Sequence, residues 1–224
     1  MKRRALALGA LLLAACSGEP PADAAAGDVQ RERAAALFQL GRPAAAREAL
    51  APLVGRGEAE AFDLFNAAAA AFAAGDAEAT GRLLERAEDL EPGSARGAFL
   101  RGQLALEQGR PELAADHLRA ALARAPADPA SKLFLATALH ESERLEEARS
   151  LLLELTALGF ENGGAWYQSA VHRLGLVLVE LGRADEAGPW LAIQRELAAE
   201  HRLPPDLRSG TLGRVEPPLS LIHI

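Results

Sequence analysis

The stretch "LALEQGRPELAADHLRAAL", residues 104–122, consists of two amphipathic segments separated by a short turn. Apolar residues recur at helical spacing on both sides of Gln108, Gly109, Arg110 and Pro111. Glycine suits the position just past the end of a helix, and proline suits the first turn of the next one. The stretch therefore predicts two helices joined by a tight turn.

The same turn recurs along the chain at a fixed interval. Gly41, Gly75 and Gly109 are each 34 residues apart, and a further 34 residues lead to Glu143. Gly182 stands in the same local context, five residues later than this interval would place it. A period of this length is typical of stacked helical repeats. We therefore expect five helix pairs with turns near residues 41, 75, 109, 143 and 182.

Two further sets of residues keep the same phase in all five units. A small residue precedes each turn by seven positions, and a leucine follows it by nine. The small residues are Ala34, Ala68, Gly102, Ala136 and Gly175, and the leucines are Leu50, Leu84, Leu118, Leu152 and Leu191. Because small side chains let helices approach closely, these positions indicate helix packing rather than a binding site.

The pattern resembles the tetratricopeptide repeat family, over roughly residues 28–200. It departs from the family in lacking tryptophan at the fourth position of the units and in having Glu143 in place of one turn glycine. The resemblance implies an all-α fold, a right-handed α-solenoid of about five helix-turn-helix repeats, which we assign to residues 28–201.

Two irregularities lie in the last unit. The five extra residues predict a longer loop at "GFENGG", residues 159–164, because glycine and asparagine favour backbone bends. Pro189 should kink the last helix or delay its start.

The first residues form a separate segment. Three basic residues at positions 2–4 precede an apolar run at 5–15, which is a typical export signal. This run is too short to span about 30 Å of hydrocarbon. Leu13 to Cys16, "LAAC", resembles the lipobox of bacterial lipoproteins, which implies that residues 1–15 are removed and that Cys16, the only cysteine, is lipidated. An ordinary signal peptide with a chance cysteine is the alternative.

The residues that follow this segment, and the charge of the chain without it, add to this reading. Residues 16–27 are proline-rich and polar, which predicts a flexible tether after the lipid. By resemblance to lipoprotein sorting rules, Ser17 favours the outer membrane, with the chain facing the periplasm. Removal of the three basic residues changes the net charge from -7 to -10, and so acidic a chain is a poor nucleic-acid binder.

The resemblance also implies a concave groove lined by the first helix of each pair. Its partner-binding residues would be Arg31, Phe38, Phe62, Phe65, Asn66, Phe72, Arg96, Phe99, Gln103, Leu106, Thr137, His140 and His172, with Leu133, Leu176 and Val179 alongside. An aromatic row there would suit an extended peptide or an apolar helix face. The alternative is that several phenylalanines only fill the core between adjacent helices.

A narrower hypothesis concerns terminal carboxylates. Some members of the family hold a peptide's carboxylate with basic and asparagine side chains, and Arg31, Asn66 and Arg96 match three of those five places. Ala35 and Leu100 occupy the other two. The alternative is that these side chains are solvated surface groups.

The sequence contains no recognisable catalytic or metal-binding motif. There is no nucleophile elbow, no phosphate-binding loop, no H-E-x-x-H and no pair of cysteines, and the five histidines are scattered. We therefore predict a protein that is not an enzyme and takes no cofactor or metal.

These observations predict a lipid-anchored scaffold that binds a protein or peptide partner in the bacterial envelope. Residues 202–224 form a linker-like tail, and "SLIHI" at 220–224 resembles a translated sequencing adapter, so we expect a truncated chain. The alternative function follows from that: a non-catalytic N-terminal region of a longer exported protein, of enzyme or FG-GAP β-propeller type, with its activity beyond residue 219.

Overall fold

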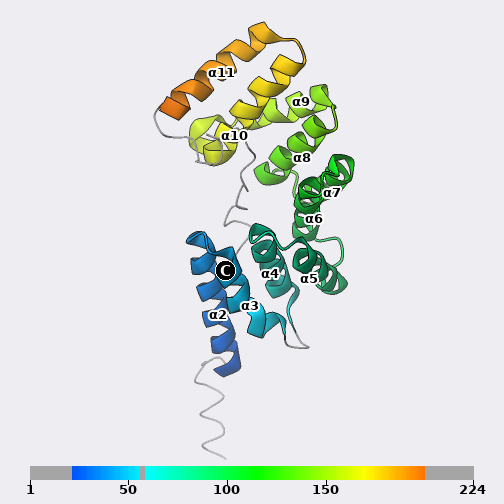
Figure 1. Cartoon of the computed structure of the whole chain (residues 1–224), viewed down its shortest axis with the longest axis vertical. Coiled ribbons are helices and arrows are strands. Elements are labelled where there is room, and N and C mark those ends of the chain that lie inside the picture. Colours follow the sequence, from blue (N-terminus) through cyan, green and yellow to red (C-terminus); the bar gives the residue numbers. More distant parts are fainter. Residues whose placement is uncertain (1–21, 56–58, 200–224) are drawn as a thin grey trace, which may run out of the picture.

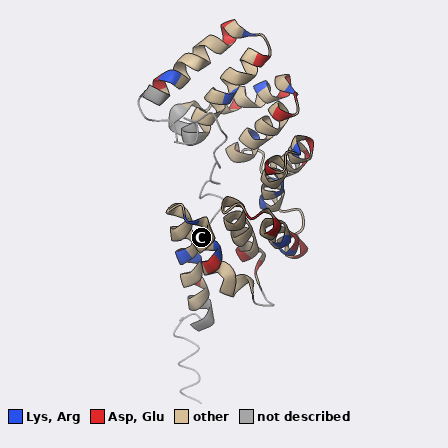
Figure 2. Cartoon of the chain, in the orientation of Figure 1, with Lys and Arg blue, Asp and Glu red and all other residues tan. Residues whose placement is uncertain are grey.

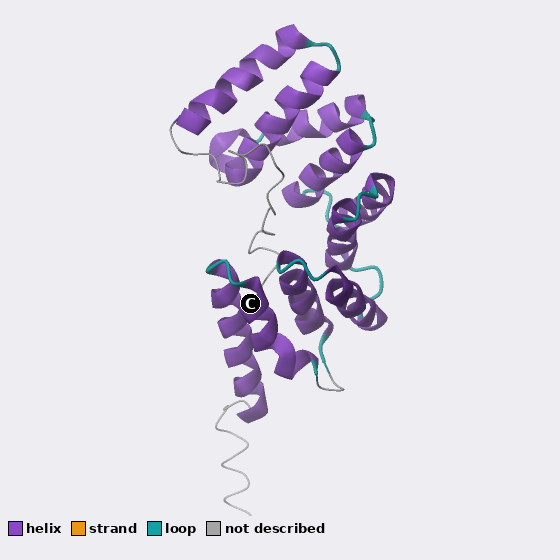
Figure 3. Cartoon of the chain, in the orientation of Figure 1, coloured by secondary structure: helices purple, strands orange, loops and turns teal. Residues whose placement is uncertain are grey.

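The computed structural model describes residues 22–55 and 59–199, and these ranges form α-helices and short connections, without any strand (Figure 1, Figure 3). The helices follow one another as five pairs. The pairs are α2 (Ala22–Gln39) with α3 (Pro43–Val54), α4 (Ala61–Ala73) with α5 (Ala77–Leu90), α6 (Ala95–Glu107) with α7 (Pro111–Arg124), α8 (Pro129–Glu141) with α9 (Leu145–Thr156), and α10 (Gly159–Glu180) with α11 (Ala184–Ala199). The predicted all-α solenoid of five helix pairs is confirmed.

The pairs stack into a solenoid because each helix packs against its neighbours in chain order. The first helices α4, α6, α8 and α10 contact one another in series, and each of α3, α5, α7 and α9 also packs on the first helix of the next pair. One hydrophobic core runs through the second to fifth pairs, and a smaller one joins α2, α3 and α4. We call the side of the first helices turned away from the second helices the inner wall.

The five turns share one backbone geometry. In the fourth turn it is Glu143, with φ of 58°, that adopts the left-handed conformation taken elsewhere by glycine, as by Gly41 at 66°. The next residue donates its N–H to the carbonyl five residues back, at 2.8 Å from Arg144 to Leu139 and 2.9 Å from Arg42 to Leu37. This Schellman-type ending satisfies the free carbonyls of the first helix, and it explains why glycine recurs in the sequence.

Glu143 holds a conformation that disfavours a side chain, so replacing it with glycine is expected to stabilise the protein. Removing the Cβ relieves a cost of about 1–2 kcal/mol, and the greater freedom of glycine in the unfolded chain returns part of it. We expect the free energy of unfolding in urea to rise by about 0.5–1 kcal/mol. Gly109→Ala is the matched control and should lower it by about 1 kcal/mol. A loss of stability in Glu143→Gly would contradict this account of the turn.

The phased small residues and leucines pack against each other within a pair. A Cβ placed on Gly102 would lie 2.5 Å from Leu118 Cγ, and one on Gly175 would lie 2.8 Å from Leu191 Cδ2. Leu118 is fully buried. The phased positions are therefore contacts between helices, as predicted.

The predicted loop at residues 159–164 is wrong, because α10 begins at Gly159 and continues to Glu180. Gly159 has φ of 71° and reverses the chain directly after α9, so a longer loop is not needed. The five extra residues extend the helix instead. Partly buried Trp166 packs against the core and holds this extension in place.

Two other boundaries also differ from expectation. The helix α2 begins at Ala22, so residues 22–27 of the predicted tether are helical. The helix α11 begins at Ala184 and runs through Pro189, so the predicted delay of its start is wrong. Residues 1–21 and 200–224, which carry the predicted signal, Cys16 and the tail, lie outside the described ranges.

Candidate functional site

The structure separates the predicted partner-binding residues by exposure. Arg31, Phe62, Phe72, Arg96, Leu106, His140 and His172 are partly exposed, and Leu176 and Val179 are exposed. Phe38, Phe65, Asn66, Phe99, Gln103, Leu133 and Thr137 are buried, which corrects the expectation that they are open to a partner. They are buried because large side chains fill the space between adjacent first helices. Phe99 of α6, for example, meets Phe134 of α8 edge to face at 5.4 Å between ring centroids.

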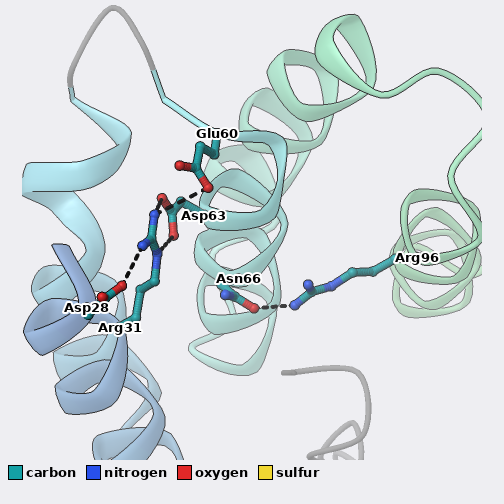
Figure 4. Close-up of polar contacts among 6 residues, drawn as sticks. All are labelled: Asp28, Arg31, Glu60, Asp63, Asn66 and Arg96. Carbon is teal, nitrogen blue, oxygen red and sulfur yellow. Dashed lines mark hydrogen bonds and ion pairs between the residues drawn. The ribbon is translucent and has the colours of Figure 1, made fainter. Parts of the chain in front are cut away.

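Arg31 is held by acidic side chains of its own chain (Figure 4). Its Nε and Nη2 donate to the two carboxylate oxygens of Asp63 at 2.8 Å each, and its Nη1 donates to Asp28 at 3.0 Å. Glu60 lies 3.4 Å from Nη2. The hydrogen bonds from Arg31 to Asp63 raise the pKa of the guanidinium above its ordinary value. The cluster joins α2 to α4 and to the segment before α4. The Asp63 side chain is only 3% exposed, so its carboxylate is buried in this contact.

Among the described residues, Arg96 forms no ion pair, and its direct contacts are with neutral side chains. Its Nη2 donates to Oδ1 of Asn66, and its guanidinium carbon lies 5.3 Å from the ring centroid of Phe62 and 5.9 Å from that of Phe65. Burial lowers the pKa of Arg96 to about 10, with Glu91 opposing the shift. Cation–π contact compensates a desolvated guanidinium only in part.

The three residues of the terminal-carboxylate hypothesis do not form one site. Figure 4 shows Arg31 turned toward Asp63 and Arg96 turned toward Asn66. Arg31 and Asn66 both border a small pocket, but its remaining lining is apolar. Its other lining residues are Ala34, Ala35, Phe38, Ala46, Leu50 and Ala70. Most donors of Arg31 are already committed, so the pocket lacks the free cation that a carboxylate needs.

A second cluster of polar side chains lies where α8 meets α10. Arg173 Nη1 lies 3.4 Å from His140 Nδ1, and His140 Nε2 lies 2.8 Å from Glu180 Oε2. A guanidinium can only donate, so Nδ1 accepts and Nε2 carries the proton that Glu180 accepts. Burial lowers the pKa of Arg173, and Glu141 opposes this shift without forming an ion pair. Sequence reasoning missed Arg173, although it precedes its turn by nine residues, as Asn66 does.

The described residues contain no group of three histidine, cysteine or acidic side chains placed to hold a metal ion. The Gln103 amide and His172 Nδ1 are buried without a hydrogen-bond partner. Among the described helices, none combines the length and apolarity required to cross a bilayer.

Comparison with known proteins bears on the fold. Residues 105–169 match the family model of the tetratricopeptide repeat. None of the curated protein sequences matches the chain. Among solved structures, MamA from Desulfovibrio magneticus RS-1 is 20% identical, covers 78% of this chain and 96% of its own, and superimposes with a TM-score of 0.64. MamA from AMB-1 is 20% identical, covers 76% and 98%, and has a TM-score of 0.62.

Similar repeats occur outside the MamA structures. The nearly identical TPR-like repeats from a Podosopora anserina protein named as a kinesin light chain are 21% identical, cover 78% of this chain and 95% of their own, and have a TM-score of 0.61. At this level of identity these likenesses define the fold, a solenoid of tetratricopeptide repeats.

Proposed function

We propose that this tetratricopeptide-repeat chain, with the family match over residues 105–169, is a non-catalytic scaffold that binds a protein partner along its inner wall. The observation that supports this most is the character of that wall. Its first helices leave apolar and cationic side chains at least partly exposed, among them Phe62, Arg96, Leu176 and Val179. Exposed apolar side chains beside polar ones are typical of surfaces that bind proteins.

We further propose that the scaffold works in the bacterial cell envelope, anchored to the outer membrane by lipid on Cys16 and facing the periplasm. The support is the signal and the lipobox-like "LAAC" at residues 13–16. Two or more acyl chains on Cys16 would give stable anchoring, because each buried CH₂ contributes about 0.8 kcal/mol. This arrangement would hold a bound partner at the membrane surface.

Partner binding is tested by affinity capture from an envelope extract with wild-type chain and a Phe62→Ala variant. Phe62 is partly exposed, so its truncation removes contact area without opening the core. We expect the wild-type chain to retain a partner that Phe62→Ala releases. Leu90→Ala, at an exposed apolar residue of α5, is the matched control and should retain it. Retention by all three proteins would count against the inner wall as the binding surface.

The anchor gives an independent prediction. Cys16→Ala removes the only thiol that can carry lipid, and we expect the chain to move from the membrane pellet to the soluble fraction on cell fractionation. Ser17→Ala changes the neighbouring residue and should remain in the pellet. Persistent membrane attachment of Cys16→Ala would refute lipidation at this position.

A further inference from the structure

A pocket of about 390 Å³ lies between the second helices α5 and α7. Its lining comes from both of these helices, from α6 between them and from Arg110 in the turn that follows α6. The lining does not include the inner-wall residues Arg96 and Leu106. Many small-molecule sites in proteins have a volume of this order. We call this space the α5–α7 pocket.

The α5–α7 pocket is open because the side chains that bridge other second helices are replaced here. Figure 2 shows acidic and basic residues interspersed on most helices. Neighbouring second helices are joined by the ion pairs Arg47–Asp76, Arg119–Glu147 and Arg149–Glu186. Within the described ranges, no ion pair joins α5 to α7. In α5, Gly81 occupies the position that Arg47 and Arg149 have in their helices, six residues after the turn, and a Cβ placed on it would meet no atom within 4 Å.

One end of the pocket carries an unbalanced negative charge. Arg101 lines this end, and its Nε and Nη2 donate to the carboxylate of Glu88 at 3.0 and 2.7 Å, so these two charges balance. Burial lowers the pKa of His117, and Arg101 acts in the same direction, so this imidazole is neutral at pH 7. Glu85 is exposed and forms no ion pair with another described residue. Its carboxylate is therefore free to take a cation.

The other end carries an unbalanced positive charge. Arg110 lies directly before Pro111, the first residue of α7, and its exposed guanidinium has no acidic partner in the part of the chain that the structure describes. Gln108 lies beside it in the lining and offers an amide. Glu78 and Arg82 also line the pocket, but they form an ion pair with each other. Arg110 is therefore the cation at this end that an anion can reach.

The two ends are separated by an apolar stretch. Arg101 and Gln108 are seven residues apart on α6, which corresponds to about 10 Å along a helix. The lining between them includes Leu104, Ala105 and Leu113. A ligand that reached both ends would therefore place apolar atoms against this stretch.

We propose that the α5–α7 pocket binds a linear zwitterion, with its carboxylate at Arg110, its ammonium at Glu85 and an apolar spacer of about 10 Å between them. Charge complementarity carries the inference, since each end offers one charge that the chain leaves unpaired. An ω-amino acid and an unblocked short peptide share this chemistry. The site is separate from the inner wall and goes beyond the scaffold function.

The test measures the Kd of two zwitterions for the full-length chain by isothermal titration calorimetry. They are 8-aminooctanoate and the unblocked tripeptide alanyl-valyl-alanine, both about 10 Å long when extended. We expect a Kd of about 1 mM or tighter for at least one of them. Octanoate lacks the ammonium and octylamine lacks the carboxylate, so each should bind about fivefold or more weakly than 8-aminooctanoate.

Variants locate the site. Arg110→Gln should weaken binding about fivefold, whereas Arg42→Gln should leave the Kd within about twofold of wild type. Arg42 is the matched control because it is also exposed and also precedes a proline at the start of a second helix.

Filling the pocket gives a test that changes no charge. Gly81→Leu places a side chain in the space between the two ends and should weaken binding about tenfold or more. Gly188→Leu is its control, because Gly188 holds the same position in α11 and a Cβ there also meets no atom within 4 Å. Thermal unfolding of each variant shows whether it is folded.

Several results would overturn the proposal. They are no binding of either zwitterion up to about 10 mM, equal binding of octanoate or octylamine, equal effects of Arg110→Gln and Arg42→Gln, or unchanged binding by folded Gly81→Leu. Binding of only one zwitterion would support the site and identify which kind of molecule it accepts. Because the α5–α7 pocket lies apart from the inner wall, neither result depends on whether Phe62→Ala releases a protein partner.

Discussion

Replacing Arg31 with methionine is expected to lower the free energy of unfolding by about 3 kcal/mol, measured by urea titration. The variant leaves the Asp63 carboxylate buried without its two hydrogen bonds from Arg31, and a buried charge that has lost its partner is costly. We place the loss at the lower end of the range for buried pairs because the Arg31 side chain is 20% exposed. Asp28 and Glu60 are largely exposed and contribute less.

The double variant Arg31→Met with Asp63→Leu tests the cause. It removes both charges, and packed apolar residues often replace a buried ion pair at little cost, so stability should return to within about 1 kcal/mol of wild type. Arg33→Met, two residues further along α2, should change stability by less than about 0.5 kcal/mol. If the double variant is no more stable than Arg31→Met, the loss does not arise from an uncompensated Asp63.

Because this cluster lies between the first two helix pairs, the loss of stability in Arg31→Met should be largest in those pairs. Repeat proteins are stabilised by contacts between neighbouring units, and Arg31 joins the first pair to the second. In Arg31→Met, amide hydrogens of α2 and α3 should therefore exchange faster, while those of α6 and α7 keep their protection. Uniform loss of protection would show a single cooperative unit instead.

The order of helices followed from the sequence because one physical requirement repeats. Each turn needs a residue in the left-handed region, and glycine tolerates it best, so Gly41, Gly75 and Gly109 mark the turns directly. The loop predicted at residues 159–164 was wrong because glycine and asparagine have low helix propensity, and packing can override that propensity. In α10, the single turn at Gly159 and the packing of Trp166 decide the boundary.

The exposure of the candidate site could not be predicted with the same success. Phe62 and Phe65 are three residues apart on one helix, yet Phe62 is partly exposed and Phe65 is buried. The difference depends on which helix lies opposite, which a repeat pattern does not specify. The partner of Arg31 is likewise 32 residues away in Asp63. Arg173 could have been found from the sequence, because it precedes its turn glycine by nine residues, as Asn66 does.

The second large effect is expected at Gly102, where alanine should destabilise the protein by about 1–3 kcal/mol. An alanine Cβ there would lie 2.5 Å from Leu118 Cγ, 2.9 Å from Cδ2 and 3.2 Å from Cδ1. Leu118 is fully buried and branches at Cγ, so it cannot move aside without disturbing the core. This overlap outweighs the gain of up to about 1 kcal/mol that alanine normally brings to a helix.

Gly81→Ala is the control with the same chemistry and the opposite expected sign. Gly81 lies inside α5, and a Cβ there meets no atom within 4 Å. It should therefore raise the free energy of unfolding by about 0.5–1 kcal/mol, through helix propensity alone. Equal effects of the two substitutions would mean that the contact with Leu118 does not limit the position.

The contribution of Leu118 itself is isolated by making Gly102→Ala in a Leu118→Ala background. Leu118→Ala alone should cost about 2–5 kcal/mol, because it leaves a cavity where the helices α6 and α7 meet. In that background the added methyl at 102 meets space rather than Leu118, so Gly102→Ala should become neutral or stabilising. A reversal of sign between the two backgrounds would show that the small residue and the leucine, which recur in all five units, form one packing contact. An unchanged loss in both backgrounds would instead place its cause elsewhere than in the contact with Leu118.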